Sequence, residues 1–434
     1  MYEQVKSLAA ELQTQMIPFC QKIVQIPSAC GEEGKVAEAV MAEMRKLGYD
    51  EVFSDEYGNV VGIIKGDEPG PNIMYNSHMD HVPPGEREKW GEFDPFCGTI
   101  TSMMTAKVDP AEQEETKVIM GRGVADMKGT IASHVYTGAL LNELRKRHGY
   151  KMRGDFIVTT VVWEEAGEML GTIKLMDETF AGKKIKVHAN ICGEPTSLRL
   201  ALGHRGRMEL SFRINGVAAH GSAPWRGVNA VTKAMKLIQE FEKTAEAEKK
   251  TDPDLGSTGY ALTMIDCEPN ANCIVPDVCN LLYDRRFTPE ESPEEMVKQA
   301  QRVIDKLTAE DKDFSASTKI KEYEHRTYTG KVLPIKNYKE AFKLDKNHPL
   351  AKQSVAALQA LGHDSTLYYW DFGTDAPVTH VRHNIPTIGY SGLQEVYCHT
   401  PLERARLDWL EKSLAGNAAI YLNVSALDVK DLAM

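Results

Sequence analysis

The chain has 434 residues, of which 42% are hydrophobic and 26% are charged, and its formal net charge at pH 7 is −11. One hydrophobic core organises at most roughly 250–300 residues, so two domains are expected. The acidic balance, without any block of Lys or Arg, argues against a nucleic-acid partner. No run approaches the ~20 apolar residues of a membrane span, so no membrane partner is expected either.

The cysteines and the N-terminus point to the compartment. The eight cysteines are scattered without a CxxC pair, which in a chain of this length does not indicate a disulfide framework. The segment 1–6 lacks the basic and apolar regions of a signal peptide. We therefore expect a cytoplasmic protein with reduced cysteines.

The first half of the chain alternates helix-like and strand-like segments. Apolar spacing predicts helices over 2–26, 32–47 and 128–147 and strands over 59–65, 72–77 and 187–192. The run 156–163 is β-branched, continuous and bounded by charged residues, which is typical of a buried central strand. Alternating strands and helices indicate an α/β layer with a mostly parallel sheet.

The pattern changes near residue 200. Strand, helix, strand, strand, helix and strand are predicted over 209–217, 228–245, 260–266, 279–287, 293–307 and 314–322. This β-α-β-β-α-β order is that of the split ferredoxin-like unit, inserted here into the first domain. The remainder returns to mixed α/β with helices over 349–361 and 406–423, and two polar stretches are predicted to be surface loops, 109–116 and 246–258.

A histidine and an aspartate follow the predicted strand 72–77. His78 and Asp80 are two residues apart, so on a continuing strand they project from one face. An Asp in that place can accept the second imidazole N–H and select the tautomer that binds a metal. The alternative is a polar turn after the strand.

Carboxylates stand at comparable places further along the chain. Glu164 and Glu165 end the most apolar strand, at the sheet edge where α/β proteins bind ligands, and two adjacent carboxylates there need a cation or a proton. Asp126 lies between glycines that permit a tight loop. Glu194 ends another strand-like run, and His399 lies near the C-terminus. The alternatives are helix caps, a solvated pair at a helix start and ordinary loop residues.

Together these residues supply two histidines and three or four carboxylates. Such a set suits two zinc ions that share one carboxylate, and cobalt or manganese also accept these ligands. The cysteines are not placed to contribute. The absence of HExxH, GxSxG and P-loop motifs disfavours a single-zinc thermolysin-type site, a serine hydrolase and a nucleotide-binding enzyme.

The order of the motifs HxDxVP, GRGxxDMKG, EE after a strand, GEPT, GxxxHGSAP, DxR and HxPxE resembles the aminoacylase, acetylornithine deacetylase and succinyl-diaminopimelate desuccinylase family of zinc hydrolases. The resemblance extends over residues 10–425. The run 203–209, followed by the HGSAP segment 220–224, is most similar to the selenium-metabolism-linked hydrolase branch.

The resemblance implies a role for each residue. The implied metal ligands are His78 and Glu194 for one zinc, Glu165 and His399 for the other, and Asp126 for both. The other implied roles are Asp80 as the group that orients His78, Glu164 as general base, His220 of a neighbouring subunit as oxyanion donor, and Arg286 and Asn272 as holders of a substrate carboxylate. Relatives often have Asp where Glu194 stands, and either carboxylate can bind zinc. Arg285 and Arg286 face opposite ways on a strand, so only one can point into the cleft.

The resemblance also implies the architecture and the reaction. We expect a zinc-binding catalytic domain formed by 1–200 and 328–434, with a dimerisation or lid domain, 201–327, inserted in it. We expect a homodimer that cleaves the amide bond of an N-acyl amino acid or short peptide with a free carboxylate, using two zinc ions per subunit. The alternatives are a dipeptidase or carboxypeptidase and, in a different class, a catalytically inactive metal-dependent binding protein.

Overall fold

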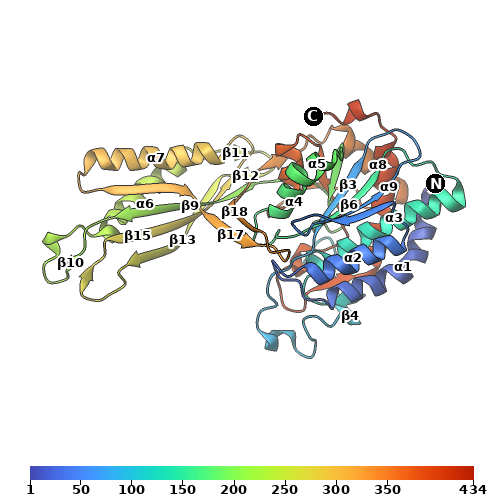
Figure 1. The fold of residues 1–434 in the computed structure, drawn as a ribbon, viewed down its shortest axis with the longest axis horizontal. Helices are drawn as coiled ribbons and strands as arrows, with labels where there is room; N and C mark the ends of the chain where they lie inside the picture. Colours follow the sequence, from blue (N-terminus) through green and yellow to red (C-terminus); the bar gives the residue numbers. More distant parts are fainter.

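The computed structural model describes residues 1–434. Figure 1 shows an α/β body that carries both termini and an elongated unit that extends away from it. The α/β body is built on a nine-stranded sheet. Its strands are β1 (Glu51–Ser54), β2 (Val60–Ile64), β3 (Ile73–His78), β6 (Phe156–Val161), β7 (Ala189–Cys192), β8 (Leu200–His204), β20 (Phe342–Lys343), β21 (Leu367–Trp370) and β22 (Thr387–Gly389).

The centre of this sheet is parallel. The strand order is β1-β2-β6-β3-β7-β22-β8-β20, with β21 also paired to β8. β6, β3, β7 and β22 pair in parallel, whereas β1, β2 and β20 add antiparallel pairs at the edges. The parallel layer predicted from the alternation of strands and helices is therefore confirmed. It matters for function because the carboxyl ends of the central strands meet at one edge.

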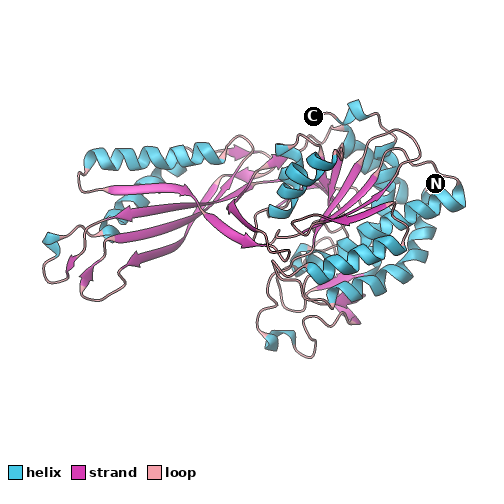
Figure 2. Cartoon of the chain, viewed as in Figure 1, coloured by secondary structure: helices cyan, strands magenta, loops and turns pink.

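Helices cover both faces of the sheet (Figure 2). They are α1 (Tyr2–Val24), α2 (Gly34–Lys46), α3 (Gly129–His148), α4 (Leu170–Lys174), α5 (Ala181–Lys183), α8 (Pro349–Leu361) and α9 (Leu407–Ser425). Short helical turns are η1 (Arg87–Trp90), η2 (Val124–Lys128), η3 (Leu175–Phe180), η4 (Pro224–Arg226), η5 (Val378–Arg382), η6 (Glu395–Tyr397) and η7 (Val429–Leu432). α3 is buried on nearly every side because α1, α9 and the sheet surround it.

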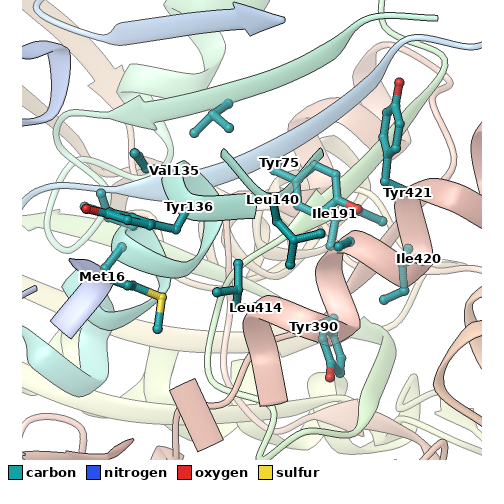
Figure 3. Close-up of a cluster of buried hydrophobic side chains, with 14 of the residues drawn as sticks. Met16, Tyr75, Val135, Tyr136, Leu140, Ile191, Tyr390, Leu414, Ile420 and Tyr421 are labelled. Carbon is teal, nitrogen blue, oxygen red and sulfur yellow. The ribbon is translucent and has the colours of Figure 1, made fainter. Parts of the chain in front are cut away.

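The main hydrophobic core lies between the sheet and these helices. Figure 3 shows Tyr75 and Ile191 of the sheet facing Leu140 of α3 and Leu414 of α9. All four side chains are buried. Because burying a side chain of this size contributes about 1.5–3 kcal/mol, this core fixes the strands whose ends carry the candidate site.

A small three-stranded sheet was not expected. It consists of β4 (Ile100–Ala106), β5 (Gln113–Met120) and β23 (Arg404–Arg406), in the order β23-β5-β4. The predicted loop 109–116 is therefore wrong in part, since β5 begins at Gln113. The first half of β5 is polar because neither of its faces is fully buried, and only its pairing with β4 makes it a strand.

The elongated unit has the predicted β-α-β-β-α-β order. Its elements are β9 (Gly206–Asn215), α6 (Ala230–Ala247), β13 (Gly259–Glu268), β15 (Val278–Phe287), α7 (Pro293–Glu310) and β16 (Ser315–Ile320). The strands pair antiparallel in the order β13-β15-β9-β16, and α6 and α7 cover one face (Figure 1). The ferredoxin-like prediction is confirmed, with a hydrophobic core of its own.

Shorter strands complete the chain. They are β10 (Ala219–His220), β11 (Thr251–Asp252), β12 (Gly256–Ser257), β14 (Ile274–Val275), β17 (Glu322–Arg326), β18 (Val332–Lys336) and β19 (Tyr338–Lys339). β11 and β12 form a small hairpin inside the predicted loop 246–258. The chain returns from the elongated unit through β19, which pairs with β9. The domain division at 201–327 stays a prediction. No helix combines the length and apolar character needed to cross a bilayer.

Candidate metal centre

The predicted donor residues come from neighbouring parts of the α/β body. His78 is the last residue of β3, Glu165 follows β6, and Glu194 follows β7. These three strands are parallel neighbours, so their carboxyl ends place the side chains at one edge. Asp126 comes from the irregular turn η2, and His399 from the loop after η6.

Asp126 lies between two groups of donor atoms. Its Oδ1 is 3.1 Å from His78 Nε2, and its Oδ2 is 3.1 Å from His399 Nε2. Glu194 Oε1 is 3.7 Å from His78 Nε2, and Glu165 Oε2 is 3.0 Å from His399 Nε2. His78, Asp126 and Glu194 thus form one group and Asp126, Glu165 and His399 the other, each with its donor atoms within 4.8 Å of one another. Histidine nitrogens and carboxylate oxygens at these separations fit two divalent cations that share Asp126.

The carboxylates of this cluster lie close together and are largely buried, so positive charge must compensate them. Hydrogen bonds to Asp126 and Glu165 raise the pKa of His399 to about 10. Burial lowers the pKa of His78, but its contacts with Asp126 and Asp80 outweigh burial and raise that pKa well above its usual value. Burial and the charge of Asp126 raise the pKa of Glu165 to about 7. Protons therefore supply the compensating charge in the metal-free protein, and bound cations would displace them.

Asp80 organises the site through its backbone and its side chain. The carbonyl oxygen of Asp80 lies 3.0 Å from His78 Nδ1, closer than its carboxylate, which is 3.5 Å away. The carboxylate accepts the backbone N–H groups of Glu164 at 3.1 Å and Glu165 at 2.9 Å, and the Cys30 thiol at 3.2 Å. Asp80 thus orients the imidazole and also holds the turn that carries both glutamates.

A buried ion pair holds the turn that carries Asp126. Glu403 Oε1 accepts the N–H groups of Ala125 at 2.8 Å and Asp126 at 3.1 Å, and its Oε2 lies 2.5 Å from Arg122 Nη1. Arg122 and Glu403 are both buried. Sequence reasoning did not assign them a role, although they stand in the motifs GRGxxD and HxPxE that supplied Asp126 and His399.

A pocket of about 450 Å³ opens beside the donor atoms. Asp126, Glu165, Glu194 and His399 border it, as does Glu164. Its other lining residues include Glu168, Arg207, Arg286, Lys339, Phe372, Glu395 and Cys398. A larger hollow of about 840 Å³ lies on the sheet of the elongated unit (β13-β15-β9-β16). None of the donor residues lines it. The smaller pocket is therefore the candidate active site.

The cations that line the pocket include Arg286, whose role in holding a substrate carboxylate stays a prediction. Arg286 donates from Nε to Asp284 at 2.8 Å, whereas Arg285 is buried on the opposite face of β15. Arg207, which was not predicted, pairs with Asp284 at 2.8 Å and with Glu168 at 3.0 Å. Its only sequence signal was its place in the run 203–209.

Lys339 was also missed, and no motif marks it. It is buried, and its Nζ contacts Glu164 Oε1. Burial lowers the pKa of Lys339, but the charges of Glu164, Glu168 and Asp375 outweigh burial and raise it. Among the cysteines, Cys398 borders the pocket, with its Sγ 3.7 Å from Ala125 O.

Two predicted residues lie away from the pocket. His220 is in β10, which Figure 1 shows at the end of the elongated unit that is remote from the nine-stranded sheet. It is exposed, and its Nδ1 accepts the backbone N–H of Ser222 at 3.1 Å. Asn272 lies in the loop before β14, the strand that pairs with β10. Neither residue reaches the pocket of its own chain.

Comparisons with known proteins agree with this architecture. Residues 202–312 match the family described as the peptidase dimerisation domain. The uncharacterized protein YgeY of Escherichia coli (strain K12) is 30% identical over 417 residues, which are 96% of each chain. A succinyl-diaminopimelate desuccinylase of Pelagibacter ubique is 28% identical over 247 residues, 56% of this chain and 59% of that protein.

Solved structures extend the likeness to the whole fold. The YXEP protein of Bacillus subtilis, a dinuclear metal binding peptidase from the M20 family, superposes with a TM-score of 0.65 at 15% identity. The match covers 96% of this chain and 99% of that protein. At this identity the likeness concerns the fold alone.

Proposed function

Since the chain belongs to the M20 family of metal-dependent hydrolases, we propose that it uses two zinc ions to cleave the amide bond of an N-acyl amino acid or short peptide with a free carboxylate. The observation that carries this proposal is the position of Asp126 between two donor groups at the border of a pocket. The two groups, each with one histidine and two carboxylates, suit zinc, and cobalt or manganese could take the same ligands.

Glu164 acts as the general base. When bound, the zinc ions would lower the pKa of a water molecule and polarise the scissile carbonyl. Glu164 borders the pocket next to the donor residue Glu165, and takes a proton from the attacking water. The same carboxyl then delivers that proton to the leaving nitrogen, which would otherwise depart as a poorly stabilised anion.

The substrate carboxylate is held by cations. Arg286 borders the pocket, and a planar guanidinium suits a bidentate contact with a carboxylate. His220 and Asn272 lie at the far tip of the elongated unit and contribute from the partner subunit of a homodimer. There, His220 stabilises the oxyanion and Asn272 helps to hold the substrate.

Dipeptidase, carboxypeptidase and deacylase activities use the same residues, so a panel of substrates separates them. Zinc-loaded protein is incubated with N-acetyl and N-succinyl amino acids and with dipeptides. Hydrolysis that a chelator abolishes and added zinc restores would support the proposal. Tight binding of a panel member without any turnover would instead indicate a catalytically inactive binding protein.

The neighbouring glutamates provide the first prediction. Glu164→Gln should keep the zinc content and lower kcat by roughly 10²–10⁴, because it removes proton transfer alone. Glu165→Gln is the matched control, which should lower zinc occupancy because Glu165 belongs to a donor group. Zinc content is measured by elemental analysis after dialysis. Unchanged turnover in Glu164→Gln would remove Glu164 from the mechanism.

A further inference from the structure

A buried lysine contacts the proposed base. Lys339 Nζ meets Oε1 of Glu164, and both side chains are less than one-tenth exposed. Glu164 Oε2 makes no hydrogen bond in the structure, and Glu164 borders the pocket. One carboxylate oxygen is therefore anchored, and the other is free to accept a proton.

The surroundings of Lys339 are rich in carboxylates. Glu168 and Asp375 are buried near it, and each has one oxygen without a partner, Glu168 Oε2 and Asp375 Oδ1. Burying such charges is costly unless a cation compensates them. Two cations compensate these carboxylates, since Lys339 contacts Glu164 and Arg207 pairs with Glu168 at 3.0 Å.

The backbone of Lys339 belongs to the strand that returns from the elongated unit. Lys339 and Tyr338 of β19 pair with Arg207 and Met208 of β9, the first strand of that unit. Glu164, in contrast, follows β6 of the nine-stranded sheet. The contact between Lys339 and Glu164 therefore connects the two sheets directly at the active site.

We propose that Lys339 is a positioning residue, which holds the Glu164 carboxylate with Oε2 directed to the pocket and ties that orientation to the placement of the elongated unit. The inference rests on the proposed function, which gives Glu164 the proton-transfer role. A glutamate has several rotatable bonds, and the oxygen of a general base must lie within about 2.6–3.2 Å of the atom that carries the proton it takes. An anchored carboxylate meets that requirement more often than a free one.

A double-mutant cycle tests whether Lys339 acts through Glu164. Lys339→Met should lower kcat by roughly 10- to 100-fold, with KM and zinc content little changed, and Lys339→Arg should recover part of the loss. In the Glu164→Gln background, Lys339→Met should cost almost no further rate, since both changes affect one carboxylate. An equal loss of rate in both backgrounds would overturn the proposal, because Lys339 would then act independently of Glu164.

Lys343→Met is the matched control. Lys343 lies on the same return segment and pairs with Asp252 at 3.0 Å, but it does not contact Glu164. The kcat of Lys343→Met should remain close to that of the wild type. A loss as large as that of Lys339→Met would show that any ion pair of this segment matters, and would overturn the specific role.

Thermal unfolding of the metal-free variants provides a readout without turnover. Because the two groups are partners, the combined variant should lose less than the sum of the two single losses in Tm. If the wild type hydrolysed no substrate, the proposed function would fail, and this unfolding cycle would still test the contact. Additive losses in Tm would overturn the inference by themselves.

Discussion

At the scale of single residues, the buried histidine His134 shows how the surroundings of a side chain set its pKa. His134 of α3 is fully buried, and both of its ring nitrogens lack a hydrogen-bond partner. Its ring packs edge-on against Tyr75 at a centroid distance of 5.2 Å, and a Cβ on Gly193 would lie 2.6 Å from it. Burial lowers the pKa of His134 to about 3. The folded protein therefore keeps this imidazole neutral in mild acid.

The sign of the resulting pH dependence follows from proton binding. Between the unfolded pKa of about 6.5 and the folded value of about 3, the unfolded chain binds a proton at His134 that the folded protein does not. The free energy of unfolding therefore falls as the pH falls through this window. At pH ~4.5 the contribution of His134 to this loss is about 2–3 kcal/mol.

His134→Leu removes this contribution. Denaturant unfolding at neutral pH and at pH ~4.5 should show that the variant loses less stability on acidification than the wild type, by about 2–3 kcal/mol. Equal losses in the two proteins would show that His134 does not titrate in this way.

At the scale of elements, the site depends on how turns are attached to strands and helices. Gly121 has φ 150°, and a Cβ there would lie 2.4 Å from Val24 of α1. The turn that starts at Gly121 is thus pressed against α1 on one side. On the other side, Glu403 accepts two of its backbone N–H groups and pairs with Arg122. Asp126 is therefore held in place because its turn contacts α1 on one side and Glu403 on the other.

Glu403→Gln should loosen this attachment. It leaves Arg122 buried without its anion, which typically destabilises a protein by about 3–5 kcal/mol. The Asp126 turn should also hold metal more weakly. Thermal unfolding of the metal-free protein and competition with a metal-sensing dye measure the two effects.

Glu114→Gln is the control for this prediction. Glu114 pairs with Arg406 at 2.6 Å, but its side chain is 43% exposed, so its loss should cost below about 1 kcal/mol. If Glu403→Gln were as mild as this control and kept its metal affinity, Glu403 would not hold the Asp126 turn.

At the scale of the whole molecule, the parts of the proposed active site are far apart in one chain. The donor groups border the pocket in the α/β body, whereas His220 and Asn272 lie at the remote tip of the elongated unit (Figure 1). A long unit with its own hydrophobic core can carry that tip to a second subunit. A symmetric dimer would then complete both active sites by the same exchange.

Complementation between two inactive variants tests this exchange. Mixed dimers of His220→Ala and Glu164→Gln contain one site with both native residues if His220 acts across the interface. Such a mixture should regain up to roughly a quarter of the wild-type activity when subunits exchange freely. If His220 acts within its own chain, every site lacks one of the two residues, and mixing restores nothing. Turnover is assayed before and after the mixed proteins are incubated together.

Local patterns predicted a large part of the architecture. The helix predicted over 349–361 has these bounds in the structure as α8, because it begins after His348 and ends before Gly362, whose φ is 69°. Period-two and helical patterns were also enough for the β-α-β-β-α-β order. β5 was missed because its first half alternates only between exposed and half-buried residues, so no buried apolar position marks it as a strand.

The sequence by itself placed His78, Glu165 and Glu194 at the ends of apolar strands, and such ends lie at one edge of a parallel sheet. The tertiary structure alone decided which groups hold those residues in place. Lys339 and Glu164 are 175 residues apart, and neither spacing nor composition relates them. The spacing of apolar residues predicts whether a segment forms a helix or a strand. A buried ion pair between two sheets depends instead on how the whole chain packs.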